Sequence, residues 1–108
     1  RPDGKDQQLA ALTGMEGGKA AGYEGLGRVY DLKGQTDQAI ENYRTALKNG
    51  KKDEKIYLQL AKAYEKKGRG REALEAYTSA YNINPDSGEA ADGITRLKIS
   101  EIQKKYKE

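Results

Sequence analysis

The sequence repeats itself at a spacing of 34 residues, and this internal symmetry limits the possible folds more than any other feature. A shift of the chain by 34 positions brings nine pairs of identical or similar residues together without a gap. The pairs are Tyr23/Tyr57, Leu26/Leu60, Gly27/Ala61, Tyr30/Tyr64, Gly34/Gly68, Ala39/Ala73, Ile40/Leu74, Tyr43/Tyr77 and Ala46/Ala80. Such a period is typical of arrays in which neighbouring units bury their apolar faces against each other.

The spacing within each unit predicts two helices joined by a turn. Tyr23, Leu26 and Tyr30 stand at positions i, i+3 and i+7, and they therefore share one face of a helix. A second stripe of the same kind runs from Ala39 to Leu47. Small residues alternate with tyrosine and leucine, which lets two helices approach closely while the rings fill the gaps. The patterns predict helices over residues 20–33, 37–49, 53–67, 71–82 and 87–105.

Glycine and polar residues mark the expected turns inside the two units. Gly34 is expected in the left-handed conformation after the first helix, with Thr36 or Asp37 capping the second helix. Gly68 and Gly70 are expected to play the same part in the second unit. Each unit is therefore expected to be a helix-turn-helix.

Two stretches, residues 22–47 and 56–85, resemble tetratricopeptide repeats. The family pattern is an aromatic residue, leucine, a small residue and tyrosine, then alanine, an aromatic residue, alanine and proline. The second stretch matches it at Tyr57, Leu60, Ala61, Tyr64, Ala73, Tyr77, Ala80 and Pro85. The first stretch matches as well, but Lys51 stands where the family favours proline. The resemblance implies an all-α fold, a right-handed α–α superhelix of two helix-turn-helix repeats with a C-terminal capping helix.

The repeats divide the chain into four segments. These are a lead-in over residues 1–19, a first repeat over 20–53, a second repeat over 54–87 and a capping helix over 88–108. The lead-in is rich in glycine and polar residues. Either it is flexible, or Gln7 to Leu12 is the remnant of a preceding repeat's second helix.

The last helix is expected to follow Pro85, with Asp86 or Ser87 as its cap. It starts in register with the repeats but carries Ala91 and Lys98 where tyrosine would be expected. This departure is typical of a terminal helix that covers the last apolar face and turns a charged side to solvent.

The composition argues against catalysis. The chain has no Cys and no His, so it lacks thiolates, the commonest general base and the usual metal ligands. Residues Gly14 to Ala20 resemble a phosphate-binding loop, but the spacing is one residue short and Ala20 replaces the hydroxyl. No carboxylate stands on an apolar stripe, where burial would shift its pKa. We therefore expect no enzyme, no cofactor and no metal.

Charge and hydropathy narrow the kind of partner. The net charge is only +3, from 20 basic and 17 acidic residues, and this balance argues against a nucleic-acid partner. The densest basic run, Lys66 to Arg71, is expected to be a solvated turn. No run approaches the roughly 18 apolar residues that a membrane span requires. A soluble protein is expected, with the cytoplasm favoured over the periplasm or export.

The resemblance implies that the first helices of successive repeats line a concave groove in which a peptide or partner helix docks. The residues expected to face it are Glu24, Arg28, Asp31, Leu58, Gln59, Lys62, Glu65, Asp92, Arg96 and Ile99. Arg28, Lys62 and Arg96 are period-equivalent and predict a basic ladder, which would suit a protein or peptide partner of acidic character. The asparagines of the family's carboxylate clamp are missing from the matching positions. The alternative function is structural self-assembly through uncovered end faces, as in a longer array.

Overall fold

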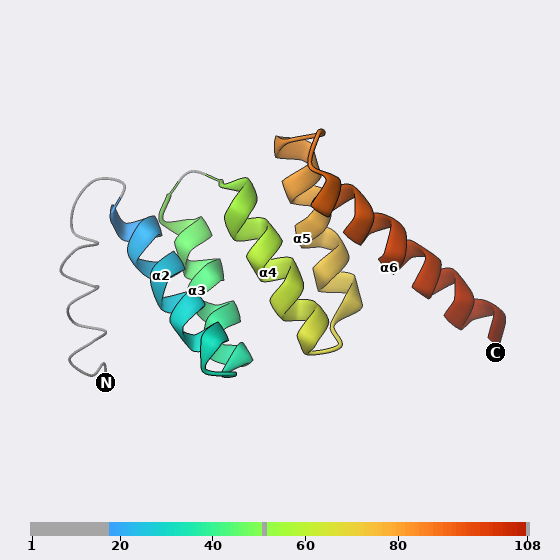
Figure 1. Cartoon of the computed structure of the whole chain (residues 1–108), viewed down its shortest axis with the longest axis horizontal. Helices are drawn as coiled ribbons and strands as arrows, with labels where there is room; N and C mark the ends of the chain where they lie inside the picture. The colour runs from blue at the N-terminus through green and yellow to red at the C-terminus, as the bar shows by residue number, and fades with distance from the viewer. Residues whose placement is uncertain (1–17, 51, 108) are drawn as a thin grey trace. The chain divides into compact units, whose positions relative to one another are not determined.

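The computed structural model describes residues 18–50 and 52–107, and every regular element in these ranges is an α-helix (Figure 1). The helices are α2 (Gly18–Leu32), α3 (Thr36–Lys48), α4 (Glu54–Lys66), α5 (Gly70–Ile83) and α6 (Gly88–Lys107). All five predicted helices form, with ends within about two residues of the predicted ones, which is the usual uncertainty of helix ends. The all-α prediction is confirmed.

The chain divides into two compact units, Arg1–Lys52 and Asp53–Glu108, and each is described by itself. The first unit holds the helix pair α2 and α3, and the second holds α4, α5 and α6. The prediction for Gln7 to Leu12, and the part of the comparison with a phosphate-binding loop that concerns residues before Gly18, fall on residues that the structure does not describe. Gly18 and Lys19 belong to the first turn of α2.

In the first unit, a tight turn reverses the chain between α2 and α3. Gly34 has φ 78°, the predicted left-handed conformation, and Gln35 N–H donates to the Tyr30 carbonyl at 2.9 Å. The prediction that Thr36 or Asp37 caps α3 is wrong. Gln35 occupies the cap position without a side-chain bond, because the helix starts early enough to include Thr36.

In the second unit, the turn between α4 and α5 is built in the same way. Gly68 has φ 72°, and Arg69 N–H donates to the Tyr64 carbonyl at 2.9 Å. Gly70 was expected to share the left-handed conformation, but it is the first residue of α5 instead. One left-handed residue is enough to end a helix, so the second glycine is free to begin the next one.

The cap predicted for α6 is confirmed at Ser87. Its hydroxyl oxygen accepts from Ala90 N–H at 3.2 Å, and the residue is buried. At the start of α4, the Asp53 carboxylate accepts from Lys55 N–H at 2.7 Å. The Asn84 amide, just after α5, donates to the Glu54 carboxylate at 3.1 Å and so ties the two ends of this helix pair together.

Tyrosine rings packed against small residues make up the centre of each unit. Among the described residues, Tyr43 and Tyr77 are the largest fully buried side chains, with 1% and 2% of their surface exposed. A Cβ atom added to Gly27 would lie 2.6 Å from the Tyr43 ring, and one added to Gly93 would lie 2.6 Å from the Tyr77 ring. The predicted packing of small against large residues is therefore observed, and in α6 it involves a glycine that the repeat pattern did not single out.

Candidate functional site

Both repeats contain the same bond between a buried tyrosine and an acid on the first helix. Tyr43 Oη donates to Asp31 Oδ2 at 3.4 Å, and Tyr77 Oη donates to Glu65 Oε1 at 2.7 Å. In each repeat the acid stands 12 residues before the tyrosine. A buried hydroxyl needs such a partner. Two acids that were predicted to face a partner therefore also hold the two helices of their own repeat together.

Glu65 is the centre of a polar cluster that joins all three helices of the second unit. Arg96 of α6 donates to Glu65 Oε2 through Nη1 at 2.8 Å and to Asp92 Oδ2 through Nε at 3.0 Å. Burial raises the pKa of the Glu65 carboxyl, but the hydrogen bonds from Arg96 and Tyr77 outweigh burial and leave the pKa below its ordinary value. Burial and the bond to Glu65 raise the pKa of Tyr77 to about 12.

The Glu65 cluster predicts a stability change in acid. Because the folded-state pKa of Glu65 lies below its ordinary value of 4.5, ionised Glu65 stabilises the folded state above pH 4.5. This contribution is lost as the pH falls through the folded-state pKa. We expect Glu65→Gln to lower the free energy of unfolding near neutral pH, and the difference from the native protein to shrink as the pH falls below 4.5. Urea denaturation followed by circular dichroism at several pH values measures that difference.

The control for this experiment is Glu75→Gln, at an exposed position on α5. Because Glu75 is exposed, its replacement should change the free energy of unfolding near neutral pH by less than Glu65→Gln does. A difference for Glu65→Gln that stays constant with pH would contradict the stabilising role of its ionised carboxylate.

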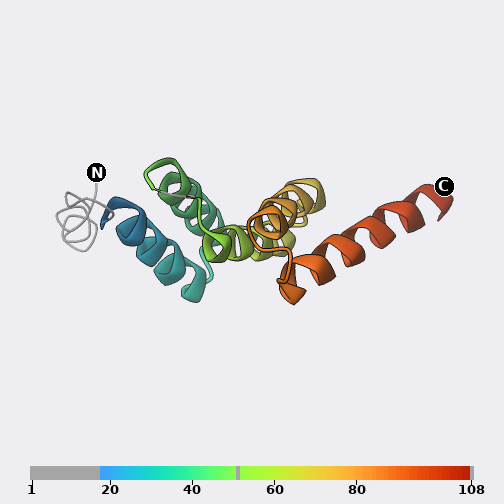
Figure 2. The same cartoon turned by 90° about the horizontal axis from the view of Figure 1, so that it is seen from above.

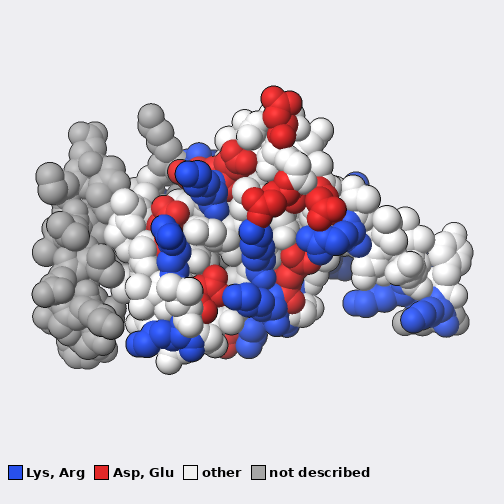
Figure 3. Space-filling model, viewed as in Figure 1, with Lys and Arg blue, Asp and Glu red and all other residues white. Residues whose placement is uncertain are grey.

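The cations of the predicted ladder in the second unit are paired with carboxylates. Lys62 forms an ion pair with Glu89 of α6, and Arg96 pairs with Glu65 and Asp92. Figure 3 shows basic and acidic side chains interspersed on this face. Arg28, in the first unit, is exposed. The sequence predicted a basic ladder with acidic neighbours beside it, and in the second unit acidic residues form ion pairs with the ladder's two cations.

The remaining predicted residues differ in their access to solvent. Ile99 is 49% exposed, and Glu24 is half-buried on α2. Leu58 is only 7% exposed, so its prediction as an open contact residue is wrong. The reason is that buried residues of α4 cover a wider arc than the single stripe assumed from the sequence. Gln59 is half-buried, and its Oε1 atom is buried with no hydrogen-bond partner among the described residues.

In the second unit, the predicted groove residues lie on α4 and α6. We use the name α4–α6 surface for the polar residues at this place. It comprises Gln59, Lys62, Glu65, Glu89, Asp92 and Arg96. Glu89 was not predicted. Its pairing with Lys62 could not be found from the period, because the residues 34 positions before Glu89 and Lys62 are Lys55 and Arg28, which carry like charges. The acids at 31 and 65, by contrast, are period-equivalent, and their fixed distance from a tyrosine was a signal in the sequence.

The basic turn between α4 and α5 makes polar and aromatic contacts within its own unit. Arg69 donates to Glu72 Oε2 through Nη2 at 3.0 Å, and its guanidinium lies 5.0 Å from the centre of the Tyr64 ring. Such stacking stabilises a turn by up to about 1 kcal/mol at exposed sites. These contacts fit the predicted solvated turn.

Two further features, a metal-binding cluster and a membrane-crossing helix, are absent from the described part of the chain. Residues 18–50 and 52–107 contain no cluster of three acids, histidines or cysteines placed to hold a metal ion. Within the same ranges, no helix combines the length and the apolar character needed to cross a membrane.

Helix-turn-helix units that share one period, one glycine turn and one tyrosine–acid bond define a helical repeat protein. The comparisons with known families agree: a model described as TPR repeat matches residues 27–68, and one described as tetratricopeptide repeat matches residues 54–87. The chain belongs to the tetratricopeptide repeat family. Among curated proteins, none matches it. Repeats of this family are generally protein–protein interaction modules and generally not enzymes.

Proposed function

We propose that the domain binds a protein partner, and that the α4–α6 surface accepts an extended peptide or a helix of that partner. The observation that carries this proposal is the pair of bridges Lys62–Glu89 and Arg96–Glu65. They hold α4 and α6 beside each other while the side chains of Lys62, Glu89 and Arg96 stay more than half exposed. A preordered surface of this kind loses little entropy when a ligand docks on it.

The charges of this surface favour a partner segment that carries both signs. Two cations and three carboxylates alternate across it, so a uniformly acidic ligand would meet repulsion from Glu65, Glu89 and Asp92. The groove residues predicted in the first unit, Glu24, Arg28 and Asp31, are a separate prediction of a partner-binding surface. Complementary charges chiefly set specificity and the rate of association.

The proposal is tested by reversing one bridge without removing it. In the double variant Lys62→Glu/Glu89→Lys, the ion pair and the net charge are retained, while each charge changes its place on the surface. Exposed ion pairs contribute only about 0–1 kcal/mol, so the fold should keep its stability. We expect the affinity for a partner, first captured from source cells with the intact domain and then purified, to fall at least about tenfold.

The matched control is Glu41→Arg/Arg44→Glu, which exchanges two exposed charges on α3 and also keeps the net charge. Isothermal titration calorimetry with the purified partner measures both variants. Equal affinity of the native protein and the α4–α6 swap would sink the proposed surface. A loss of affinity in the α3 swap alone would place binding elsewhere.

A further inference from the structure

The C-terminal part of α6 leaves the helix that its first part packs against. The buried residues of α6, Ala90 and Gly93, both lie in its first turns, while all residues over 98–107 are exposed. Figure 2 shows this part of α6 running away from α5. We call residues 98–107 the exposed end of α6. At about 1.5 Å per residue it is roughly 15 Å long, which is enough for a two- or three-turn contact with another helix.

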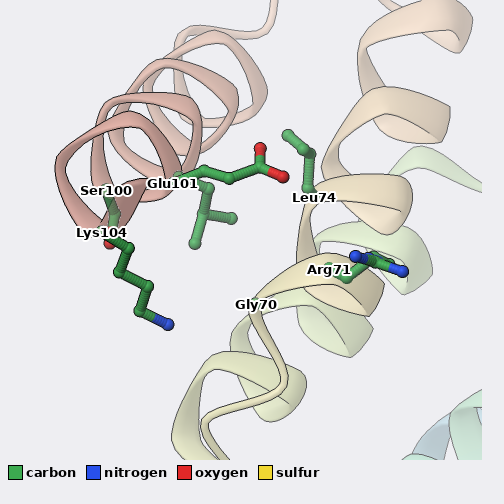
Figure 4. Close-up of a pocket in the computed structure, with 7 residues that line it drawn as sticks. Gly70, Arg71, Leu74, Ser100, Glu101 and Lys104 are labelled. Atoms are coloured by element: carbon green, nitrogen blue, oxygen red, sulfur yellow. The ribbon is translucent and has the colours of Figure 1, made fainter. Parts of the chain in front are cut away.

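A cavity between the two helices marks the point at which they separate. It has a volume of about 280 Å³, and Leu74 and Leu97 contribute its apolar lining, with Arg71, Glu101 and Lys104 around them (Figure 4). The gap shows that α5 does not cover the exposed end of α6 on this side. Both signs of charge meet in the cavity, so it points to no particular ligand.

The other side of the exposed end carries an apolar stripe. Ile99, Ile102 and Tyr106 stand at i, i+3 and i+7, so they share one face of α6, and their exposed fractions are 49%, 54% and 87%. A shallow hollow is lined by Ile102, Gln103, Tyr106 and Lys107. An apolar side chain from another molecule would fit such a hollow and remove these residues from water.

Lysines border this stripe. Lys98 and Lys105 stand seven residues apart and follow one edge of it, and Lys107 lies near the other edge. The exposed end carries four lysines against one acid, Glu101, and on the face seen in Figure 3 the end of α6 shows basic and uncharged surface. An apolar stripe between lysines is complementary to an apolar stripe between carboxylates.

We propose that the exposed end of α6 binds an acidic amphipathic helix of a partner protein. This inference rests on the proposed protein-binding function and adds to it the chemistry of one partner segment. Two copies of the exposed end would bring four lysines against four lysines, which disfavours self-association. A lipid surface is less well matched, since three large apolar side chains give a small area for insertion, whereas a hollow fits a single protein side chain.

The test uses a fluorescent helical peptide of about four turns with leucines at i, i+3 and i+7 and glutamates on both sides. A second peptide has lysines in place of the glutamates. We expect the protein to bind the acidic peptide, and the double variant Ile102→Ser/Tyr106→Ser to bind it at least about tenfold more weakly, measured by fluorescence anisotropy. Binding should also weaken as salt is added.

The matched control is Leu32→Ser, which removes an apolar side chain that is 89% exposed on α2. It should bind the acidic peptide as the native protein does. Equal binding of the two peptides, no binding of the acidic peptide, or equal binding by the stripe variant would each overturn the inference. So would binding to phosphatidylserine-containing vesicles in preference to the peptide, or a dimer in sedimentation that the stripe variant abolishes.

Failure of this inference is distinguishable from failure of the proposed function. If the purified partner loses affinity for the Lys62→Glu/Glu89→Lys swap but binds Ile102→Ser/Tyr106→Ser normally, the α4–α6 surface stands and the stripe does not. The reverse result would place the partner on the exposed end of α6 alone.

Discussion

Replacing Gly93 with valine is expected to lower the free energy of unfolding by about 3 kcal/mol, at the upper end of the cost of overpacking a core. A Cβ atom at this position would lie 2.6 Å from two carbons of the Tyr77 ring. The ring cannot move aside easily, because it is 2% exposed and its hydroxyl is bonded to Glu65. The extra methyl groups must therefore push α6 away from α5. Urea denaturation followed by circular dichroism measures the loss.

The control is Gly88→Val, in the first turn of the same helix. No heavy atom lies within 4 Å of a Cβ added to Gly88. Its effect should stay within about 0.5 kcal/mol, as for most surface substitutions. Equal stability of the two variants would show that the contact between Gly93 and the Tyr77 ring is looser than the structure indicates.

Truncating Tyr77 itself is expected to cost about 3–5 kcal/mol, the range for removing a buried aromatic ring to alanine. The ring fills the space between α5 and Gly93 of α6, and its hydroxyl joins the Glu65 cluster. Tyr77→Phe, which keeps the ring and removes only the hydroxyl, should cost about 1–3 kcal/mol, because Glu65 loses one of its donors. Thermal and urea denaturation of both variants separate the ring from the hydroxyl.

The matched control for this pair is Tyr81→Ala, one turn further along α5. Tyr81 is 38% exposed, so its removal leaves no closed cavity and should cost clearly less than removal of Tyr77. If Tyr77→Phe were as destabilising as Tyr77→Ala, the hydroxyl bond would dominate, and packing of the ring against Gly93 would not be the main stabilising contact.

Most of the fold could be predicted, because its main determinants are local. The stripe that begins at Tyr23 and the left-handed glycines at 34 and 68 act over one or two helical turns, where neighbours in sequence are neighbours in space. The failures were also local. Thr36 was expected to cap α3 but is the first residue of that helix. The reason is that residues 33–35 already complete the turn between α2 and α3.

The candidate site could be predicted only in part. The first helices, and most of the residues on them that reach solvent, followed from the period and the family resemblance. The ion-pair partners of these charged residues followed from neither. Lys62 was placed in a basic ladder, yet it pairs with Glu89, which lies beyond the whole of α5 in the chain. Leu58 was placed on an open face and is buried, since α4 is covered over a wide arc.

The sequence by itself determined the helices, their turns and the repeat class. Its apolar residues recur at helical spacing, and the whole pattern recurs after 34 residues. Few other folds would remove apolar side chains arranged in this way from water. Only the tertiary structure decided which charges neutralise each other and that the exposed end of α6 leaves α5. Those outcomes depend on where the helices cross, and each crossing is set by contacts such as that of Gly93 with the Tyr77 ring, between residues of different helices.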